Sequence, residues 1–174
     1  MDTGNHKMTE TMNEQGSKIT WKKGLFQCAY RLFSGNRQIG KLKPGLVHLS
    51  AKAEVEDRSY RFHISEWKQR GQVVDLLTNK VVATIRFSHW LPKATIEYQG
   101  QRYTWSLSNL WETRWKLVGD TGAVYRYKGW SCKGQVEGSI PINLLSVVGL
   151  FISHYYWQLS VIIAAALIPL FIAS

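Results

Sequence analysis

The sequence of 174 residues predicts a mainly β fold, in which about twelve strands form a closed antiparallel barrel around a hydrophobic C-terminal helix. Three observations support this prediction. Short runs that alternate apolar and polar residues fill most of the chain, as half-buried strands do. The connections between these runs are mostly of hairpin length, so neighbouring strands should pair antiparallel. From residue 141 onward, 34 residues pass without Asp, Glu, Lys or Arg, so this apolar segment has to be hidden from water.

We expect a single domain preceded by a short tail. Residues 1–17 are polar, contain no aromatic residue and show no periodicity, so we predict a disordered lead-in. Residues 18–140 carry the predicted strands of the barrel. Residues 141–174 form the apolar helix that completes the same domain. A chain of this length is sufficient for one domain with a sizeable core.

The predicted strands follow one another with turn residues between them. Residues 60–67 show the pattern most clearly, because Tyr60, Phe62 and Ile64 share one face and polar residues take the other. Residues 99–101 give a hairpin signal. The predicted strands are residues 19–23, 25–33, 38–42, 46–53, 60–67, 72–77, 80–88, 93–98, 102–107, 111–118, 123–128 and 131–139.

The width of such a barrel suggests a role for the C-terminal segment. Closing the sheet removes its exposed edges, but a barrel of about twelve strands is too wide for its own side chains to fill. It needs a ligand, a channel or a plug, and the chain ends in a helix that is apolar all round. About 18–20 residues of 144–174 would thread a barrel of ~25–30 Å height. In this hypothesis the helix is the core of the barrel.

A membrane span is the alternative for the same segment. Residues 144–174 exceed the roughly 20 residues that a bilayer requires. Residues 155–157 would then form an interfacial aromatic belt, and the upstream lysines would fit a cytoplasmic side. His154, Gln158 and Ser160 would then lie among lipid-facing residues at a cost in free energy. The two hypotheses overlap if the apolar end beyond Pro169 protrudes from the barrel.

Three stretches and the terminal helix carry a resemblance to a known family. The stretches are YRFHISEWKQRGQVVDLLTNKVVATIRF at residues 60–87, ATIEYQGQRYTWSLS at 94–108 and RWKLVGDTGAVYRYKG at 114–129. In strand rhythm and closing helix, residues 18–174 resemble the tubby C-terminal-like superfamily, which includes tubby proteins, phospholipid scramblases and LURP-one-related proteins. The resemblance implies a twelve-stranded barrel around a central C-terminal helix. It also implies that hydropathy alone can mistake this helix for a membrane span.

The chain departs from this family at its functional residues. No acidic loop next to the helix corresponds to a scramblase calcium site. The lysine and arginine set with which tubby proteins hold phosphoinositides has no match either. The chain looks most like the small LURP-one-like members, and the family does not settle their biochemistry.

The charge of the chain favours an anionic partner. Lys and Arg number 22 against 12 Asp and Glu, and all 22 precede residue 141. We expect binding to anionic phospholipid at a membrane surface or to an unidentified protein partner, and we do not expect nucleic acid. The alternative is that the net charge of +10 serves solubility alone. The candidate lipid-binding residues, which share the polar parity of their strands, are Arg86, Arg102, Arg114, Lys116, Arg126 and Lys128.

Two further sets of residues are candidates for a role. His154 and Gln158 lie four residues apart, hence on one helix face, where they form either a ligand-binding polar spot or a satisfied core pair. Among the eight tryptophans, Trp105 shares its parity with aliphatic neighbours and is expected to fill the core, as is Trp115. Trp90 and Trp111 stand beside predicted turns and are expected to be exposed, where they would dip into a membrane.

No residue pattern indicates catalysis. The five histidines lack metal-ligand spacing, neither of the two cysteines lies in a CxxC motif, and no nucleophile elbow or phosphate loop is present. The acidic residues at 54–57 fit a solvated turn. We therefore expect no enzyme and no cofactor or metal. The cysteine content and the absence of an apolar leader predict a cytoplasmic, membrane-associated protein. The alternative is a soluble β domain anchored by a single C-terminal span.

Overall fold

The computed structural model describes residues 17–24, 29–45, 50–65, 69–88, 90–109, 111, 113–130, 132–139 and 143–172, with backbone alone at residues 17 and 167–172. These residues form twelve strands and one helix. The elements are β1 (Ser17–Lys23), β2 (Tyr30–Ser34), β3 (Arg37–Pro44), β4 (Ser50–Val55), β5 (Arg58–Ser65), β6 (Arg70–Asp75), β7 (Lys80–Phe87), β8 (Lys93–Tyr98), β9 (Gln101–Leu107), β10 (Arg114–Gly119), β11 (Val124–Trp130), β12 (Lys133–Gly138) and α1 (Leu144–Ile172).

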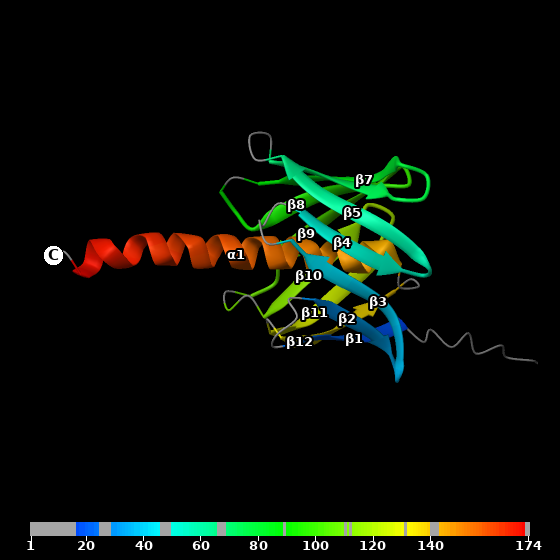
Figure 1. Ribbon diagram of the computed structural model, residues 1–174, viewed down its shortest axis with the longest axis horizontal. Coiled ribbons are helices and arrows are strands. Elements are labelled where there is room, and N and C mark those ends of the chain that lie inside the picture. Colours follow the sequence, from blue (N-terminus) through cyan, green and yellow to red (C-terminus); the bar gives the residue numbers. More distant parts are fainter. Residues whose placement is uncertain are drawn as a thin grey trace, which may run out of the picture.

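The strands form a closed barrel in which each pairs antiparallel with its neighbours in sequence, and β1 pairs with β12 to close the ring. Helix α1 runs along the barrel axis (Figure 1). The predicted fold, a twelve-stranded antiparallel barrel around the C-terminal helix, is therefore confirmed. Closure pairs all twelve strands on both sides, so the sheet has no free edge.

The predicted strands all recur, with shifted boundaries. The turn between β4 and β5 contains only Glu56 and Asp57, both at positive φ (51° and 62°), so the strands reach closer to the turn than expected. A two-residue turn with positive φ at both positions matches the twist of the flanking strands. Of the predicted lead-in at residues 1–17, residues 1–16 lie outside the described residues, and Ser17 is instead the first residue of β1. Residues 25–28, 46–49 and 66–67, which were expected to lengthen three strands, also lie outside the described residues.

The first half of α1 fills the barrel. Leu145, Val147 and Ile152 are fully buried, and the ring of Phe151 lies 4.7 Å from that of Phe62 on β5. The strands contribute alternate side chains to this core, as the pleat requires. Trp105 and Trp115 are both buried, as their parity predicted. Burial of apolar surface between helix and strands is the main stabilising contribution in such a core.

The second half of α1 extends beyond the barrel (Figure 1). The strands have 5–8 residues and rise about 3.3 Å per residue, so each spans at most about 26 Å. Helix α1 has 29 residues and is therefore about 44 Å long at 1.5 Å per residue. A barrel of this height cannot enclose a helix of this length, so part of the helix has to protrude.

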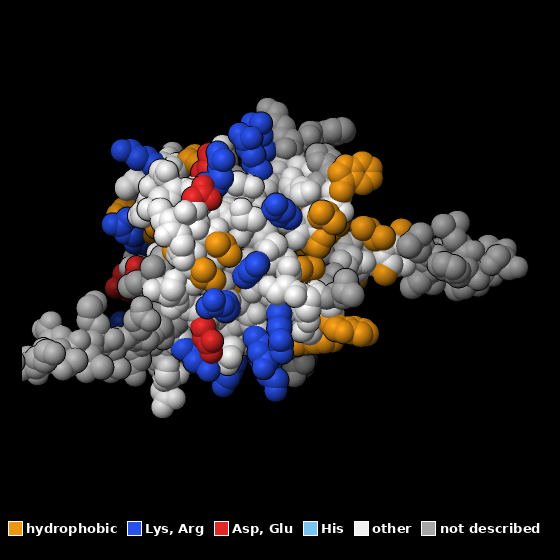
Figure 2. Space-filling model, turned by 180° about the vertical axis from the view of Figure 1, so that it is seen from behind, with side chains coloured by type: hydrophobic (Ala, Val, Ile, Leu, Met, Phe, Trp, Pro, Cys, Tyr) orange, Lys and Arg blue, Asp and Glu red, His pale blue; other side chains and the backbone are white. Residues whose placement is uncertain are grey.

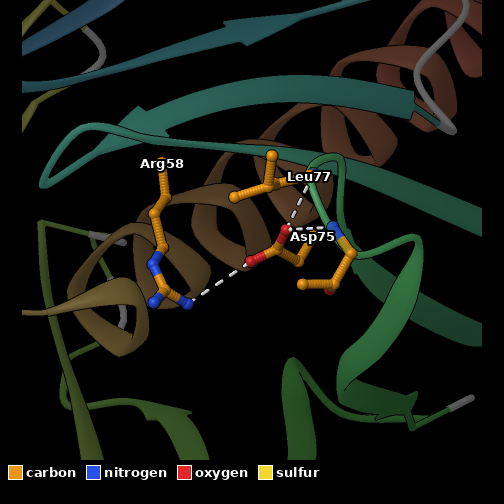
Figure 3. A network of polar contacts seen from close by, with 4 residues as sticks. Arg58, Asp75 and Leu77 are labelled. Carbon is orange, nitrogen blue, oxygen red and sulfur yellow. Dashed lines mark hydrogen bonds and ion pairs between the residues drawn. The ribbon is translucent and has the colours of Figure 1, made fainter.

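One buried carboxylate fixes the turn between β6 and β7 (Figure 3). Asp75 is 1 % exposed and accepts hydrogen bonds from the backbone N–H groups of Leu77 (2.8 Å) and Thr78 (3.0 Å). The Arg58 guanidinium on β5 lies 3.5 Å from its other oxygen. The Thr78 amide, then the Leu77 amide and the Arg58 charge, lower the pKa of Asp75 below its usual value. This carboxylate is therefore ionised in the folded protein.

We expect Asp75→Ala to lower the unfolding midpoint by several degrees, because it removes the acceptor for two turn amides. Arg58→Ala should have a much smaller effect, since the Arg58 side chain is largely exposed. The folded-state pKa of Asp75 is depressed, so its contribution to stability is present above pH 3.8 and lost as the pH falls through the lower folded value. Thermal unfolding of both variants between pH 2 and 7 tests this. Equal effects of the two substitutions would contradict it.

Candidate functional site

The barrel has two different ends. The helix begins at the end where β12 stops and β11 starts, which we call the cap end. It leaves at the opposite end, where β7 stops and β8 starts, which we call the exit end (Figure 1). At the exit end the Tyr156 hydroxyl donates to the backbone carbonyl of Lys93, the first residue of β8. The connections at the exit end are β1–β2, β3–β4, β5–β6, β7–β8, β9–β10 and β11–β12.

At the cap end, polar contacts fix the start of the helix. The Asn143 side-chain oxygen accepts a hydrogen bond from the Leu145 amide (2.9 Å) and from the Tyr125 hydroxyl (3.2 Å). Asn143 is thus the N-cap, which satisfies one of the free amides of the first turn. The Tyr127 hydroxyl donates to the carbonyl of Ser146 (3.1 Å). Burial raises the pKa of the Tyr127 hydroxyl well above 10.0, so it keeps its proton at neutral pH.

The helix approaches β9 and β11 most closely at Gly149. The Trp105 indole N–H donates to the Gly149 carbonyl at 3.1 Å. A Cβ at this position would collide with the Tyr127 hydroxyl. A residue without a side chain is therefore required where the two strands contact the helix. These contacts fix the height of the helix in the barrel, and hence the point at which it leaves.

Aromatic side chains surround the helix near the exit end. The Tyr30 hydroxyl lies 2.9 Å from His154 Nδ1, and the rings of Trp105 and Tyr156 stack at 5.3 Å. The ring of Tyr155 packs 4.4 Å from that of Phe87. Tyr155 and Tyr156 therefore pack against strands of the barrel. The membrane-span hypothesis had put both residues in an interfacial aromatic belt. In this structure they belong to the part of the helix that fills the barrel.

The helix leaves the barrel near Trp157, which is 42 % exposed, and Gln158, which is half-buried; the side chains of residues 159–166 are all exposed. Successive helix residues point about 100° apart, so Val161, Ile162 and Ile163 cover most of the circumference. The protruding helix therefore presents no polar face to water. By length and composition alone, Leu144–Ala166 is long and apolar enough to cross a membrane.

Exposed tryptophans stand at the exit end around the helix. Trp90 in the β7–β8 connection is 93 % exposed, Trp111 in the β9–β10 connection 82 %, and Trp130 at the end of β11 68 %. The predicted exposure of Trp90 and Trp111 is confirmed. At the cap end, the exposed large hydrophobic residues of the described chain are Leu76, Leu77 and Val81, none of them aromatic. Figure 2 shows exposed hydrophobic side chains gathered where the helix emerges.

The connections hold these tryptophans in place. Asn109 accepts hydrogen bonds from the backbone amides of Thr113 (3.2 Å) and Arg114 (2.9 Å), which closes the loop that carries Trp111. Two backbone hydrogen bonds at Lys93 close the loop that carries Trp90. Lys23 lies at the same end, with its ammonium 5.6 Å from the centroid of the Trp157 ring and 5.2 Å from that of Tyr30. These cation–π distances place a positive charge where the helix leaves the barrel.

Charge is divided between the two ends of the barrel. Every Asp and Glu of the described chain lies in the half nearer the cap end: Glu54, Glu56, Asp57, Asp75, Glu97, Asp120 and Glu137. The three ion pairs given by the described residues, such as Lys18 with Glu137 at 3.3 Å, lie there too. Glu66 and Glu112 lie outside the described residues. The described side chains near the exit end thus include many cations and no carboxylate.

The cations near the exit end stand opposite one another on neighbouring strands. The cross-strand pairs include Lys22 with Lys133 and with Arg31, Lys43 with Lys52, Arg70 with Arg86, and Arg114 with Lys128. Like charges directly opposite each other destabilise a sheet. These pairs therefore lower the stability of the sheet while they concentrate positive charge at this end.

The structure brings four of the predicted lipid-binding residues together. Arg114 pairs with Lys128, and Lys116 pairs with Arg126, on the outer face of β10 and β11. The other two lie apart from them. Arg102 lies near the cap end, 3.9 Å from Glu97, and Arg86 is on β7 beside Arg70. Whether any of these residues binds lipid stays a prediction.

The predicted polar spot lies where the helix leaves the barrel. His154 is buried beside Tyr30, and Gln158 is half-buried one turn further on. A cavity of about 40 Å³ adjoins His154 and is lined mainly by aromatic rings, including Trp21 and Trp115. Their buried indole N–H groups have no acceptor among the described residues. The cavity has room for about one to three waters and is far below the several hundred Å³ of a typical ligand pocket.

Two features of this end were missed by the reasoning from sequence. Trp130 was not singled out as exposed, although it is the last residue of a strand on the polar parity of Arg126 and Lys128. The division of charge was also missed, although the order of strands and turns in the sequence carries the signal.

Within the described residues, no group of three His, Cys, Asp or Glu could hold a metal ion.

We expect Gly149→Ala to destabilise the barrel by about 1–3 kcal/mol through overpacking, although Ala has the higher helix propensity by about 1 kcal/mol. The collision is with the Tyr127 hydroxyl, so the same substitution should cost less in a Tyr127→Phe background. Urea unfolding of the two single variants and the double variant measures the coupling. Strictly additive effects, or a more stable Gly149→Ala protein, would show that this contact does not position the helix.

The chain was compared with known proteins in three ways. No protein-family model, no curated protein and no solved structure matches it. Its function therefore has to be inferred from the geometry of the barrel, the protruding helix and the exit end.

Proposed function

We propose that the protein is a non-enzymatic β-barrel module that is held on an anionic membrane surface by the second half of α1. One observation carries the proposal: α1 stays uncharged and apolar beyond Gln158, where its described side chains are exposed outside the barrel. In this proposal the helix has two parts, a plug inside the barrel and an anchor outside it. The two hypotheses for the C-terminal segment then describe different halves of one helix.

A bilayer suits the protruding helix better than a protein partner does. A helix that docks on a protein buries one face and keeps the other polar. Residues 159–166 are exposed, and their only polar side chain is Ser160, whose hydroxyl donates to the Tyr156 carbonyl within the helix. A solvent that surrounds the whole helix, such as lipid, matches this pattern. Residues 159–172 measure about 21 Å, which is more than one leaflet of a ~30 Å hydrocarbon core.

The tryptophans at the exit end support the same orientation. Trp prefers the interface between headgroups and hydrocarbon, because its ring is largely apolar and its N–H needs a polar partner. Trp90, Trp111 and Trp130 lie on separate connections or strands around the emerging helix. With the helix inserted, they would meet the membrane surface together.

The charge division supports an anionic surface. Near the exit end, the cations would face the headgroups, while the described carboxylates would face away. Each Lys or Arg near an anionic leaflet contributes about 1 kcal/mol of attraction, which falls off within a Debye length and weakens as salt rises. Cations beside an apolar helix also favour a cytoplasmic location. We therefore propose a cytoplasmic location for the barrel.

The resemblance to the tubby C-terminal-like superfamily is in keeping with a barrel around a C-terminal helix, and we propose that the chain is a member. The proposal for its function does not rest on this membership. It rests on the length of α1, on the exposed residues after Gln158 and on the charge at the exit end.

Two truncations test the proposal. Deleting residues 159–174 should leave a folded barrel with an almost unchanged melting temperature, because the plug remains in place. It should also lower binding to acidic vesicles by far more than tenfold, since several large apolar side chains lose their burial in lipid. Deleting residues 144–174 should give an aggregated product, because the inward apolar faces of the strands become exposed.

The measurements are circular dichroism and vesicle flotation, with neutral and acidic vesicles at low and high salt. Unchanged flotation after deletion of residues 159–174 would refute the anchor. Loss of folding in that variant would refute the division of the helix into a plug inside the barrel and an anchor outside it. Equal binding of the intact protein to neutral and acidic vesicles would remove the electrostatic part of the proposal and leave apolar insertion alone.

A further inference from the structure

A groove of about 700 Å³ lies on the outer wall of the barrel near the exit end. It crosses β10, β11, β12 and β1, which are neighbours in the closed sheet. We propose that this groove binds the phosphate of an anionic phospholipid headgroup. The inference deepens the proposed membrane anchoring and rests on it, since the bilayer brings the lipid to the groove.

Four cations line the groove: Lys22, Arg114, Lys128 and Lys133. They form two cross-strand pairs of like charge, Lys22 with Lys133 and Arg114 with Lys128. None of the four takes part in an ion pair among the described residues. No carboxylate is among the described residues that line the groove, and Glu112, which precedes Thr113 in the chain, lies outside them. An anion in the groove would offset the repulsion within both pairs.

The remaining side chains suit a phosphate group. Thr20 and Thr113 bring hydroxyl groups to the groove, and the Arg114 guanidinium can donate two parallel hydrogen bonds to phosphate oxygens. Gln135 also lines the groove, and its amide donates to Glu137 at 3.3 Å. The backbone of Arg114 is held by Asn109, which accepts from its amide. A phosphate would therefore meet both full charges and neutral donors.

Two paired glycines form the floor of the groove. Gly129 on β11 is paired with Gly134 on β12, and both lie against the ring of the buried Trp21. A Cβ on either glycine would collide with that ring. The wall is thus thin at this point, with the Trp21 ring directly beneath it.

The position of the groove favours a lipid over other sources of phosphate. Trp130, 68 % exposed, stands at its rim, and the protruding part of α1 leaves the same end of the barrel. With the helix in the hydrocarbon and Trp130 at the interface, the four cations lie at the depth of the headgroups. A nucleic acid would gain nothing from the apolar helix beside the groove.

The test compares two double variants of the full-length protein that remove the same charge. Arg114→Gln with Lys128→Gln removes a cross-strand pair inside the groove. Arg70→Gln with Arg86→Gln removes a cross-strand pair near the same end, on β6 and β7 outside the groove. We expect the groove variant to lose at least tenfold more affinity for acidic vesicles than the matched variant, while both partition equally into neutral phosphatidylcholine vesicles.

A second readout separates binding from structure. The groove variant should melt at the same temperature as the parent protein or higher, because it loses a like-charge pair. Equal losses of affinity in the two variants would refute the inference that the groove binds lipid phosphate, but would not contradict the membrane proposal. Absence of vesicle binding by the parent protein would instead overturn the membrane proposal. Displacement from acidic vesicles by inorganic phosphate at constant ionic strength, or by a single-stranded oligonucleotide, would reassign the groove and overturn the lipid inference.

Discussion

The structure depends on the packing of one helix inside a barrel that its own side chains cannot fill. Twelve strands enclose a lumen as wide as a helix, so the inward residues have no core until α1 is present. Apolar burial supplies the attraction. Polar contacts set the depth, because Asn143 caps the helix at the cap end and Tyr127 and Trp105 donate hydrogen bonds to the helix backbone inside the barrel. The helix therefore cannot slide without breaking buried hydrogen bonds.

The fixed depth decides what lies outside the barrel. The strands are too short to cover 29 helical residues, so an uncharged stretch leaves at one end. That end also carries the exposed tryptophans and opposed cations, while the described carboxylates lie in the other half. Opposed cations lower the stability of the sheet, and such costs are commonly found where a surface has a function. The proposed membrane at the exit end would account for the protruding helix, the exposed tryptophans and the charge together.

Much of this fold could be predicted from sequence, because strand alternation and turn residues are local signals. Barrel closure could be predicted because a closed sheet has no exposed edge strands. The site was harder to predict. No charged residue lies on either side of Trp157 in the helix, so the exit point depends on the height of the barrel. The pairing of Arg114 with Lys128, and of Gly129 with Gly134, depends on register across strands. The role of Asn143 as N-cap could also have been predicted, because it is a polar residue directly before an apolar run.

The most direct measurement of the central claim is hydrogen exchange along α1, with and without acidic vesicles. Two halves with different surroundings should behave differently. Amides at residues 148–156 should exchange slowly in both conditions, because they open only with the barrel. Amides at residues 160–167 should exchange much faster in water and become protected when vesicles are added. Uniform protection along the whole helix in water, or no change at residues 160–167 with vesicles, would contradict the division into plug and anchor.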